Sequence, residues 1–258
     1  MFYATVYLQG LGVTAAAAFG AWLLSVARRN VAIVDSLWPL MFAFMACTYA
    51  AGAPRLGPRA AWILVLVGAW AMRLFIYITA RNWGHAEDRR YRGIRARNEP
   101  HFAAKSLYLV FALQAALAWV ISLPLLGAIL SPRPPGILDA AGAGLWLLGF
   151  IFEAGGDWQL ARFKAQPSNQ GKVMDRGLWR LTRHPNYFGD FCVWWGFYLM
   201  GVSAGAWWSI LGPLLMSLLL LRVSGVTLLE KDIGERRPQY AEYVRRTNAF
   251  FPGMPRRQ

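Results

Sequence analysis

The chain has 258 residues, of which 57% are hydrophobic and 13 are tryptophan, and its formal net charge is +14. A mean hydropathy of +0.33 excludes an ordinary soluble domain and predicts a single helical transmembrane domain over residues 1–258. The Lys and Arg residues lie between long apolar runs, which argues against a nucleic-acid partner. Their positions instead indicate how the chain is oriented in the membrane.

Seven apolar runs follow one another along the chain. A bilayer core about 30 Å thick requires roughly 20 apolar residues in a helix. We therefore expect an all-α integral membrane protein that crosses the bilayer seven times, at residues 3–27, 31–51, 60–80, 105–130, 137–160, 187–202 and 206–223. Glu153 and Asp157 interrupt the fifth run, and the sixth run is short.

The first run contains Gly10-Leu11-Gly12-Val13-Thr14-Ala15, which matches the dinucleotide-binding pattern G-x-G-x-x-A. A Rossmann site also requires a preceding strand and a βαβ unit, and neither is indicated here. We interpret these residues as a close-packing stretch of the first span. The run lacks a basic n-region and a clear cleavage site, so we expect a retained span and not a removed signal peptide.

The two cysteines give no sign of a disulfide framework or of a metal site. Cys47 and Cys192 lie inside apolar stretches, and their spacing is not that of metal ligands. We expect both to be core residues and expect no bound metal.

The basic residues predict the orientation of the chain. Almost all of them fall near residues 28–29, in 81–105 and 162–183, and in the tail beyond residue 230, whereas the opposite side has only Arg55, Arg59 and Arg133. The positive-inside rule makes the basic side cytoplasmic, and seven spans then place the N-terminus outside. If the protein has a site for a soluble ligand, we expect it in these cytoplasmic segments, because they are long, charged and rich in Tyr, Trp and Asn.

Among the ionisable residues within predicted spans are Asp35 in the second and Arg73 in the third. Each costs about 2.5–3.5 kcal/mol to insert, so each requires a partner or a function. Both residues could serve only to pair neighbouring helices. For Asp35 we favour function, because a carboxyl in apolar surroundings can hold its proton and act as an acid.

Glu153 and Asp157 are four residues apart and share one helix face near the end of the fifth run. Like charges at this spacing repel, so the pair indicates a site that binds hydroxyl or amine groups of a ligand. The alternative is that Asp157 forms an ordinary interfacial ion pair with Arg162 or Lys164.

The strongest local motif is residues 177–190, Gly-Leu-Trp-Arg-Leu-Thr-Arg-His-Pro-Asn-Tyr-Phe-Gly-Asp. Pro185 stands where a first-turn proline belongs, so a helix should begin there. Arg183, His184 and Asn186 at such a terminus indicate an anion site for phosphate or carboxylate. The alternative is interfacial anchoring, which does not require the His-Pro-Asn core.

The end of the chain offers further polar residues. Arg222 ends the seventh run, and Glu230 could orient the nearby cations. Tyr240 and Arg245 follow in the tail, where a plain amphipathic interfacial helix is an equally good explanation.

With residues 183–189, Asp157 upstream and residues 229–231 downstream, the chain resembles two related groups of membrane enzymes. One is the steroid 5-alpha-reductase family, and the other is the isoprenylcysteine carboxyl methyltransferases. The likeness to the reductases extends over nearly the whole chain and looks closest to bacterial homologues, which implies a bacterial inner-membrane protein. It includes residues 34–38, 73–75, 81–82 and 155–157 and the region of Arg222.

The resemblance implies a seven-helix enzyme that binds NADPH in a cytoplasm-facing pocket and reduces the double bond of a 3-oxo-4-ene steroid or a similar enone. Asp35 matches the family's carboxylate on the second helix, whereas Trp70 stands where the family has its tyrosine proton donor. Asp35, with Tyr77 or Trp70 as a hydrogen-bond donor, would then supply the acid. Positions that match or adjoin the cofactor contacts are Arg81, Asn82, Asp157, Lys164, Asn186 and Arg222.

Our hypothesis places the phosphates of NADPH at Lys164, Arg183, Arg222 and Arg245, with His184, Glu230 and Tyr240 also in the cofactor site. A steroid-like enone would enter from the membrane lipids, and Asp35 would stabilise the enolate oxygen. One alternative is an S-adenosylmethionine-dependent methyltransferase acting on a membrane lipid or prenylated acceptor. Another is a lipid-binding scaffold protein without enzymatic activity.

Overall fold

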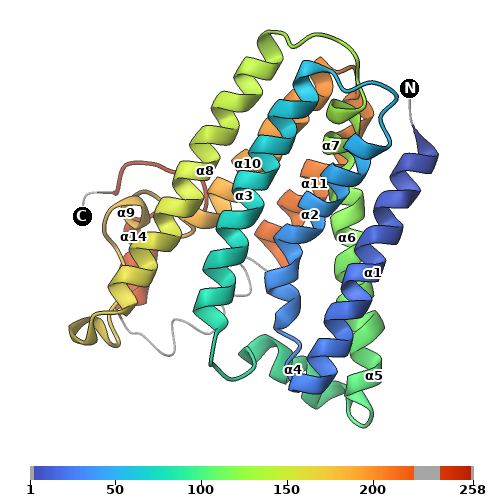
Figure 1. Cartoon of the computed structure of the whole chain (residues 1–258). Helices are drawn as coiled ribbons and strands as arrows, with labels where there is room; N and C mark the ends of the chain where they lie inside the picture. The colour runs from blue at the N-terminus through green and yellow to red at the C-terminus, as the bar shows by residue number, and fades with distance from the viewer. Residues whose placement is uncertain (1–2, 224–238, 257–258) are drawn as a thin grey trace. The chain divides into compact units, whose positions relative to one another are not determined.

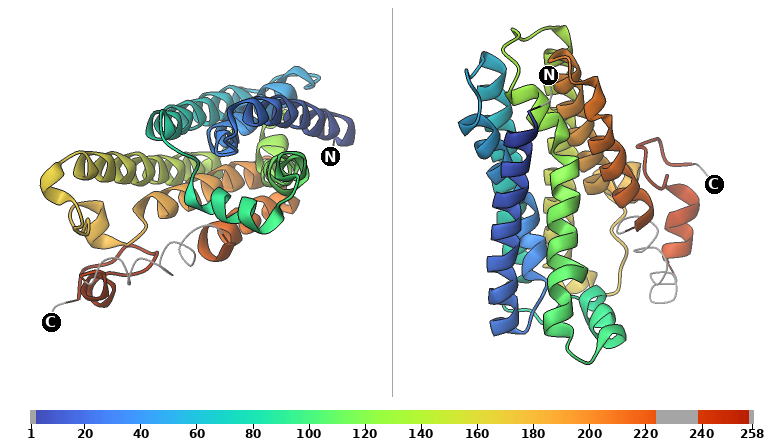
Figure 2. Two further views of the ribbon diagram at one scale, coloured as in Figure 1. Left: turned by 90° about the horizontal axis from the view of Figure 1, so that it is seen from below. Right: turned by 90° about the vertical axis from the view of Figure 1, so that its right-hand side faces the viewer.

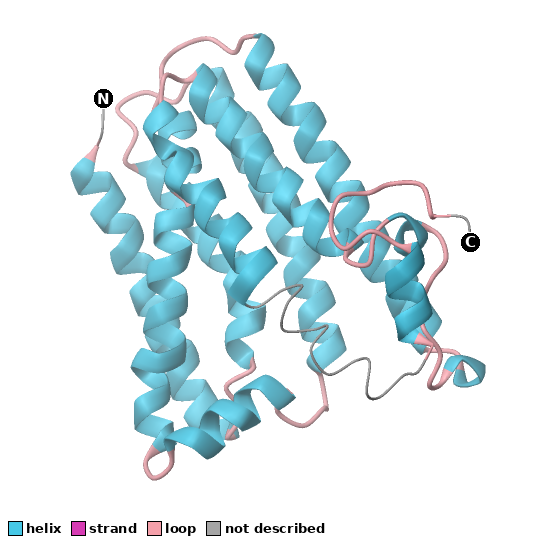
Figure 3. Ribbon diagram, turned by 180° about the vertical axis from the view of Figure 1, so that it is seen from behind, coloured by secondary structure: helices cyan, strands magenta, loops and turns pink. Residues whose placement is uncertain are grey.

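A computed structural model describes residues 3–223 and 239–256 of the chain. These residues form helices and loops without a strand, as Figure 3 shows. They divide into two compact units. The first unit comprises Met1–Gly136 with Gly201–Leu211, and the second comprises Ile137–Met200 with Gly212–Gln258.

Five helices in the described part of the chain are long and apolar enough to cross a membrane. They are α1 (Ala4–Arg28), α2 (Ile33–Ala51), α3 (Pro58–Asn82), the segment Phe102–Ile121 and α8 (Ile137–Lys164). They coincide with the first five predicted runs. The sixth run forms α10 (Pro185–Ser203), and the seventh lies in a shorter apolar helix, Trp207–Arg222, made of η3 (Trp207–Ile210), α11 (Leu211–Leu218) and η4 (Leu219–Val223). The all-helical fold is therefore confirmed for the described residues, and five of the seven expected spans are long and apolar enough to cross a membrane.

In the first unit, consecutive helices pack as neighbours. Figure 1 shows α2 lying between α1 and α3, and Figure 2 shows α1 beside the helix that contains α6. At Gly10 of α1 an added Cβ would lie 2.6 Å from the ring of Tyr49 of α2, so glycine allows the two helices to approach closely. The glycine motif of the first run is thus part of a continuous helix, as expected.

The fourth predicted span is not one regular helix. It consists of α5 (Phe102–Ser106), the π-helix η1 (Leu107–Ala112), α6 (Leu113–Ile121) and α7 (Leu123–Ile129). The break falls at Ser122, whose hydroxyl is 2.7 Å from that of Tyr49, and Pro124 lies in the first turn of α7. Hydropathy predicted an unbroken run over residues 105–130, but proline lacks the N–H that would continue the helical hydrogen bonds.

The two ends of the first unit differ in charge. At one end, α4 (Arg89–Asn98) lies where α1 ends and α2 begins (Figure 1). The basic segments 28–29 and 81–105 come together there, since the backbone N–H of Val31, just after the first segment, donates to Glu87 Oε1 at 2.9 Å. At the other end, buried Arg59 donates to the carbonyls of Arg133 and Pro134 at 3.1 and 3.0 Å. Within this unit the predicted asymmetry of the cations is therefore present.

The prediction that both cysteines are core residues is right for Cys192, which is buried, and wrong for Cys47, which is exposed on α2. The lipid-facing side of a membrane helix is as apolar as its packed side, so hydropathy alone does not separate the two.

In the second unit, α8 and α10 pack through glycines. The other helices described here are η2 (Pro167–Asn169), α9 (Leu178–Leu181) and α14 (Tyr240–Arg246). A Cβ added at Gly149 would lie 2.5 Å from the Gly189 carbonyl oxygen and 2.7 Å from the Val193 nitrogen. Because these are backbone atoms, they cannot move aside without separating the helices.

Replacing Gly149 with alanine is therefore expected to destabilise the protein by about 1–3 kcal/mol, since the added methyl group overpacks a contact between backbones. Gly144 is the matched control, because it lies in the same helix and an added Cβ there meets nothing within 4 Å. Gly144→Ala should be neutral or stabilising by up to about 1 kcal/mol. Thermal unfolding of both variants in detergent, followed by circular dichroism, measures the difference. Equal melting temperatures would contradict this account of the packing.

Candidate active site

Asp35 is held by two side chains of α4 in the first unit. Its Oδ1 accepts a hydrogen bond from the Tyr91 hydroxyl at 2.6 Å, and its Oδ2 lies 2.9 Å from Arg90 Nη2. The Asp35 side chain is 16% exposed, and Tyr91 is 5% exposed. A carboxylate near the start of an apolar helix therefore has both a cation and a hydroxyl donor in direct contact.

The loop before α4 positions these two partners. The Asp88 carboxylate caps the helix by accepting from the Arg90 backbone N–H at 2.8 Å, and it also accepts from Arg90 Nε at 3.0 Å. Glu87 accepts from Arg95 Nη2 at 2.8 Å and from the Val31 backbone N–H at 2.9 Å. These bonds tie α4 to the start of α2, so the position of Tyr91 over Asp35 is built into the fold.

The groups around α4 favour the ionised forms of Glu87 and Asp88 and the protonated form of Tyr91. Burial would raise the pKa of Glu87, but the bonds from Arg95 and Val31 hold that pKa below its usual range. Burial would also raise the pKa of Asp88, but hydrogen bonds from the backbone N–H and the guanidinium of Arg90 hold that pKa below its usual range. Burial, and then the Asp35 carboxylate beside it, raise the pKa of Tyr91. Tyr91 therefore keeps its proton at neutral pH and remains a hydrogen-bond donor.

The predicted residues of the third helix occupy different positions along α3. Trp70 is fully buried, with its ring 5.7 Å from that of Phe42 in an edge contact. Near the end of the helix, the Arg81 guanidinium lies 5.8 Å from the centre of the Tyr77 ring, and Arg81 Nε donates to Asn82 Oδ1 at 3.1 Å. Arg81 also interacts electrostatically with Asp35. The structure thus brings Arg81 toward the Asp35 cluster and places Trp70 in the core.

Tyr91 and Arg90 were not among the site residues predicted from the sequence. The segment 81–104 was predicted to hold site residues because it is charged and contains aromatic residues, and that composition was the available signal. Tyr91 and Asp35 are 56 residues apart in the chain. Their contact depends on how α4 folds back onto α2, which no local pattern specifies.

In the second unit, Asp157 and Asn186 are in contact. Asn186 Nδ2 lies 3.2 Å from Asp157 Oδ1, which joins α8 to the first turn of α10. Glu153 and Asp157 are 3% and 5% exposed, so the carboxylates predicted to share one helix face are both buried. Trp179 Nε1 donates to the carbonyl of Gly156 at 3.0 Å and closes the site on one side. The result is a buried acceptor next to a fixed amide.

Helix α10 begins at Pro185, as the motif predicted. Just before it, the buried Arg183 guanidinium donates to the carbonyls of Thr247 and Val244 at 2.7 and 3.3 Å. His184 is buried and stacks on Tyr187, with ring centroids 5.7 Å apart. Arg183 therefore holds the C-terminal tail against α10, a structural role that the anion-site hypothesis did not include.

The other predicted cofactor residues are spread over the second unit. Lys164 is exposed at the end of α8, where it lines a cavity of about 390 Å³ together with Lys172. Arg222 and Arg245 are exposed, and Tyr240 is buried with its ring 5.7 Å from that of Tyr243. Glu230 lies outside the described residues.

The donor set of the second unit fits a phosphorylated dinucleotide. A buried carboxylate and an amide, Asp157 and Asn186, can bind ribose hydroxyls or a carboxamide, and the cations at the two-lysine cavity suit phosphates. Within residues 3–223 and 239–256, no group of three or more His, Cys, Asp or Glu side chains could hold a metal ion.

Comparison with known proteins adds a family and one relative. The family described as "Protein of unknown function (DUF1295)" matches residues 21–247 of the chain. Uncharacterized protein C594.04c of Schizosaccharomyces pombe is 27% identical, over 90% of this chain and 76% of the yeast protein. No solved structure matches the chain.

Proposed function

The chain belongs to the DUF1295 family, which is steroid 5-alpha-reductase-like, and we propose that it is an NADPH-dependent reductase of lipophilic enones. The substrate class is 3-oxo-4-ene steroids or similar enones dissolved in the membrane. The reaction adds a hydride to the carbon β to the carbonyl and a proton to the neighbouring carbon.

The contact between Asp35 and Tyr91 is the observation that carries this proposal. Hydride addition to an enone places negative charge on the carbonyl oxygen, and a positioned O–H donor in a dry site stabilises that charge. Tyr91 is such a donor, because it is buried and the raised pKa of its hydroxyl keeps it protonated. In the reaction Tyr91 redirects its single O–H from Asp35 to the substrate oxygen, while Arg90 remains paired with Asp35.

The residues of the second unit would hold the cofactor. NADPH supplies the hydride when it is bound. Asp157 and Asn186 bind its hydroxyl or carboxamide groups, and its phosphates are held by Lys164, Arg222 and Arg245. Arg183 is omitted from the phosphate ligands, because its guanidinium already donates to two buried carbonyls of the tail.

We place the basic end of the first unit in the cytoplasm. Nine of the 13 Lys and Arg residues of the unit lie at that end, and the positive-inside rule makes the end with more cations cytoplasmic, here in a bacterial inner membrane. The N-terminus is then periplasmic, and a water-soluble cofactor reaches the site from the cytoplasm.

Cofactor binding by the purified protein separates this proposal from the methyltransferase alternative. The full-length chain in detergent should bind NADPH saturably and should oxidise it only when a 4-ene-3-one substrate is added. Isothermal titration calorimetry and the loss of NADPH absorbance measure the two quantities. Saturable binding of S-adenosylmethionine without binding of NADPH would overturn the reductase assignment.

A further inference from the structure

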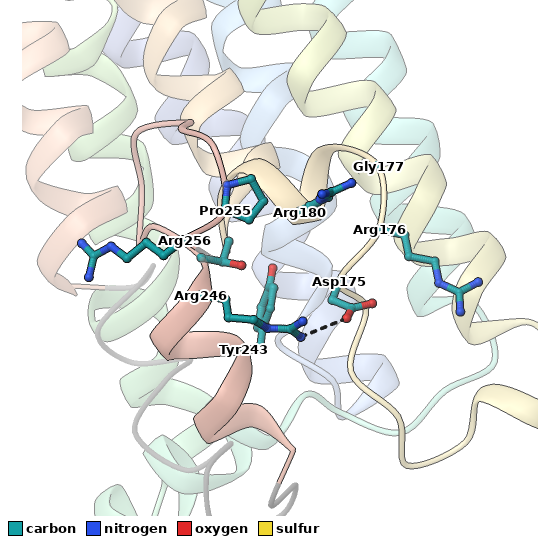
Figure 4. A pocket seen from close by; sticks show the side chains of 9 residues that line it. Asp175, Arg176, Gly177, Arg180, Tyr243, Arg246, Pro255 and Arg256 are labelled. Atoms are coloured by element: carbon teal, nitrogen blue, oxygen red, sulfur yellow. Dashed lines mark hydrogen bonds and ion pairs between the residues drawn. The ribbon is translucent and has the colours of Figure 1, made fainter. Parts of the chain in front are cut away.

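A cavity of about 590 Å³ lies in the second unit between the loop that precedes α9 and the C-terminal tail (Figure 4). It is a different cavity from the one lined by Lys164, and none of the predicted cofactor residues lines it. Its charged lining residues are Asp175, Arg176, Arg180, Arg246 and Arg256. Four arginines and one aspartate give the lining a net charge of +3.

Three of the four guanidinium groups are available to a ligand. Arg246 is paired, with its Nη2 3.4 Å from Asp175 Oδ2, and Figure 4 shows this contact. For Arg176, Arg180 and Arg256, the described part of the chain provides no side-chain hydrogen bond or ion pair. In Figure 4, the side chains of Arg176 and Arg256 extend outward from the cavity in opposite directions. Guanidinium groups bind phosphate in a bidentate manner, so this lining suits a phosphorylated ligand.

The walls of the cavity are fixed to each other. The Tyr243 hydroxyl donates to the carbonyl of Trp179, which joins α14 to α9. The Arg256 backbone N–H donates to the Arg246 carbonyl at 3.0 Å, and the Gly253 N–H donates to the Leu181 carbonyl at 3.0 Å. The cavity therefore exists before a ligand binds, and its size is that of a small-molecule site.

We propose that this cavity binds the phosphate headgroup of an anionic phospholipid, at a site separate from the reductase site. Two observations favour a lipid over a soluble phosphate. The tail that forms one wall exposes apolar side chains beside the arginines, since Met254 is 88% and Phe251 is 60% exposed. The chain also has five helices long and apolar enough to cross a membrane, and clusters of basic residues on membrane proteins bind anionic headgroups. The acyl chains would lie along Met254 and Phe251.

Titration of the full-length protein in neutral detergent tests this site. Dioctanoyl phosphatidic acid should bind saturably, and the double variant Arg180→Gln/Arg256→Gln should bind it at least about tenfold more weakly because two charge-assisted contacts are lost. Arg97→Gln is the matched control, since Arg97 is exposed on α4 and does not line the cavity. The control should bind the lipid as the unmodified protein does, and both variants should keep its melting temperature.

Four results would overturn the proposal. If dioctanoyl phosphatidylcholine bound as tightly as the phosphatidic acid, the site would not discriminate by the charge of the headgroup. If Arg97→Gln weakened lipid binding as much as the double variant does, the attraction would be unspecific. Binding of glycerol 3-phosphate as tight as that of the lipid would assign the cavity to a soluble phosphate. Competition between NADPH and the lipid would assign it to the cofactor.

Discussion

Replacing Asp35 with alanine is expected to lower the turnover of an enone substrate by roughly 10²–10³-fold, the usual effect of removing one stabilising group from an oxyanion site. The substitution removes the acceptor that positions the Tyr91 hydroxyl and the partner of Arg90. The affinity for NADPH should remain unchanged, because the proposed cofactor residues belong to the second unit. Steady-state kinetics together with calorimetric titration of NADPH measure both quantities.

Tyr91→Phe is the companion variant, since it removes only the hydroxyl that donates to Asp35. If Tyr91 donates to the substrate oxygen, its loss should lower turnover as much as the loss of Asp35, and the double variant should be no worse than either single variant. Glu99→Gln, at an exposed carboxylate beside α4, is the control and should retain full activity. Loss of NADPH binding in Asp35→Ala with normal chemistry would refute the assignment.

Replacing Asp157 with alanine is expected to weaken NADPH binding by about 10- to 150-fold, because a hydrogen bond to a charged group typically contributes about 1.5–3 kcal/mol. The carboxylate is 5% exposed and lies 3.2 Å from the Asn186 amide, so alanine removes a buried acceptor from the proposed site. The dissociation constant of NADPH, measured by fluorescence or calorimetry, gives the effect directly.

A swap of the pair separates a ligand role from a structural one. The double variant Asp157→Asn/Asn186→Asp keeps one carboxylate and one amide in contact, so it should recover most of the thermal stability lost by Asp157→Ala. It moves the charge from α8 to α10, so NADPH binding should remain weak. Recovery of both stability and binding would contradict a direct contact between Asp157 and the cofactor.

Most of the helices could be located from local sequence patterns. Membrane helices are selected by the transfer free energy of about 20 consecutive residues, which depends on composition alone, so the first three runs and the fifth were found within a few residues, whereas the fourth was predicted to extend past the break at Ser122. The start of α10 at Pro185 and the shared buried face of Glu153 and Asp157 also follow from local rules, namely the fixed φ of proline and the helical repeat.

Which polar groups are in contact depends on the packing of the helices and loops. Tyr91 contacts Asp35 across 56 residues, and Arg183 contacts the Thr247 carbonyl across 64. The cavity arginines likewise come from distant parts of the chain, namely α9 with the loop before it and α14 with the tail after it. Hydropathy and helix propensity act on neighbouring residues, whereas these contacts depend on how helices and loops fold back on one another. The sequence therefore indicated which segments contain the chemistry, and only the packing of α4 on α2 and of the tail on α9 and α10 assigned each side chain its partner.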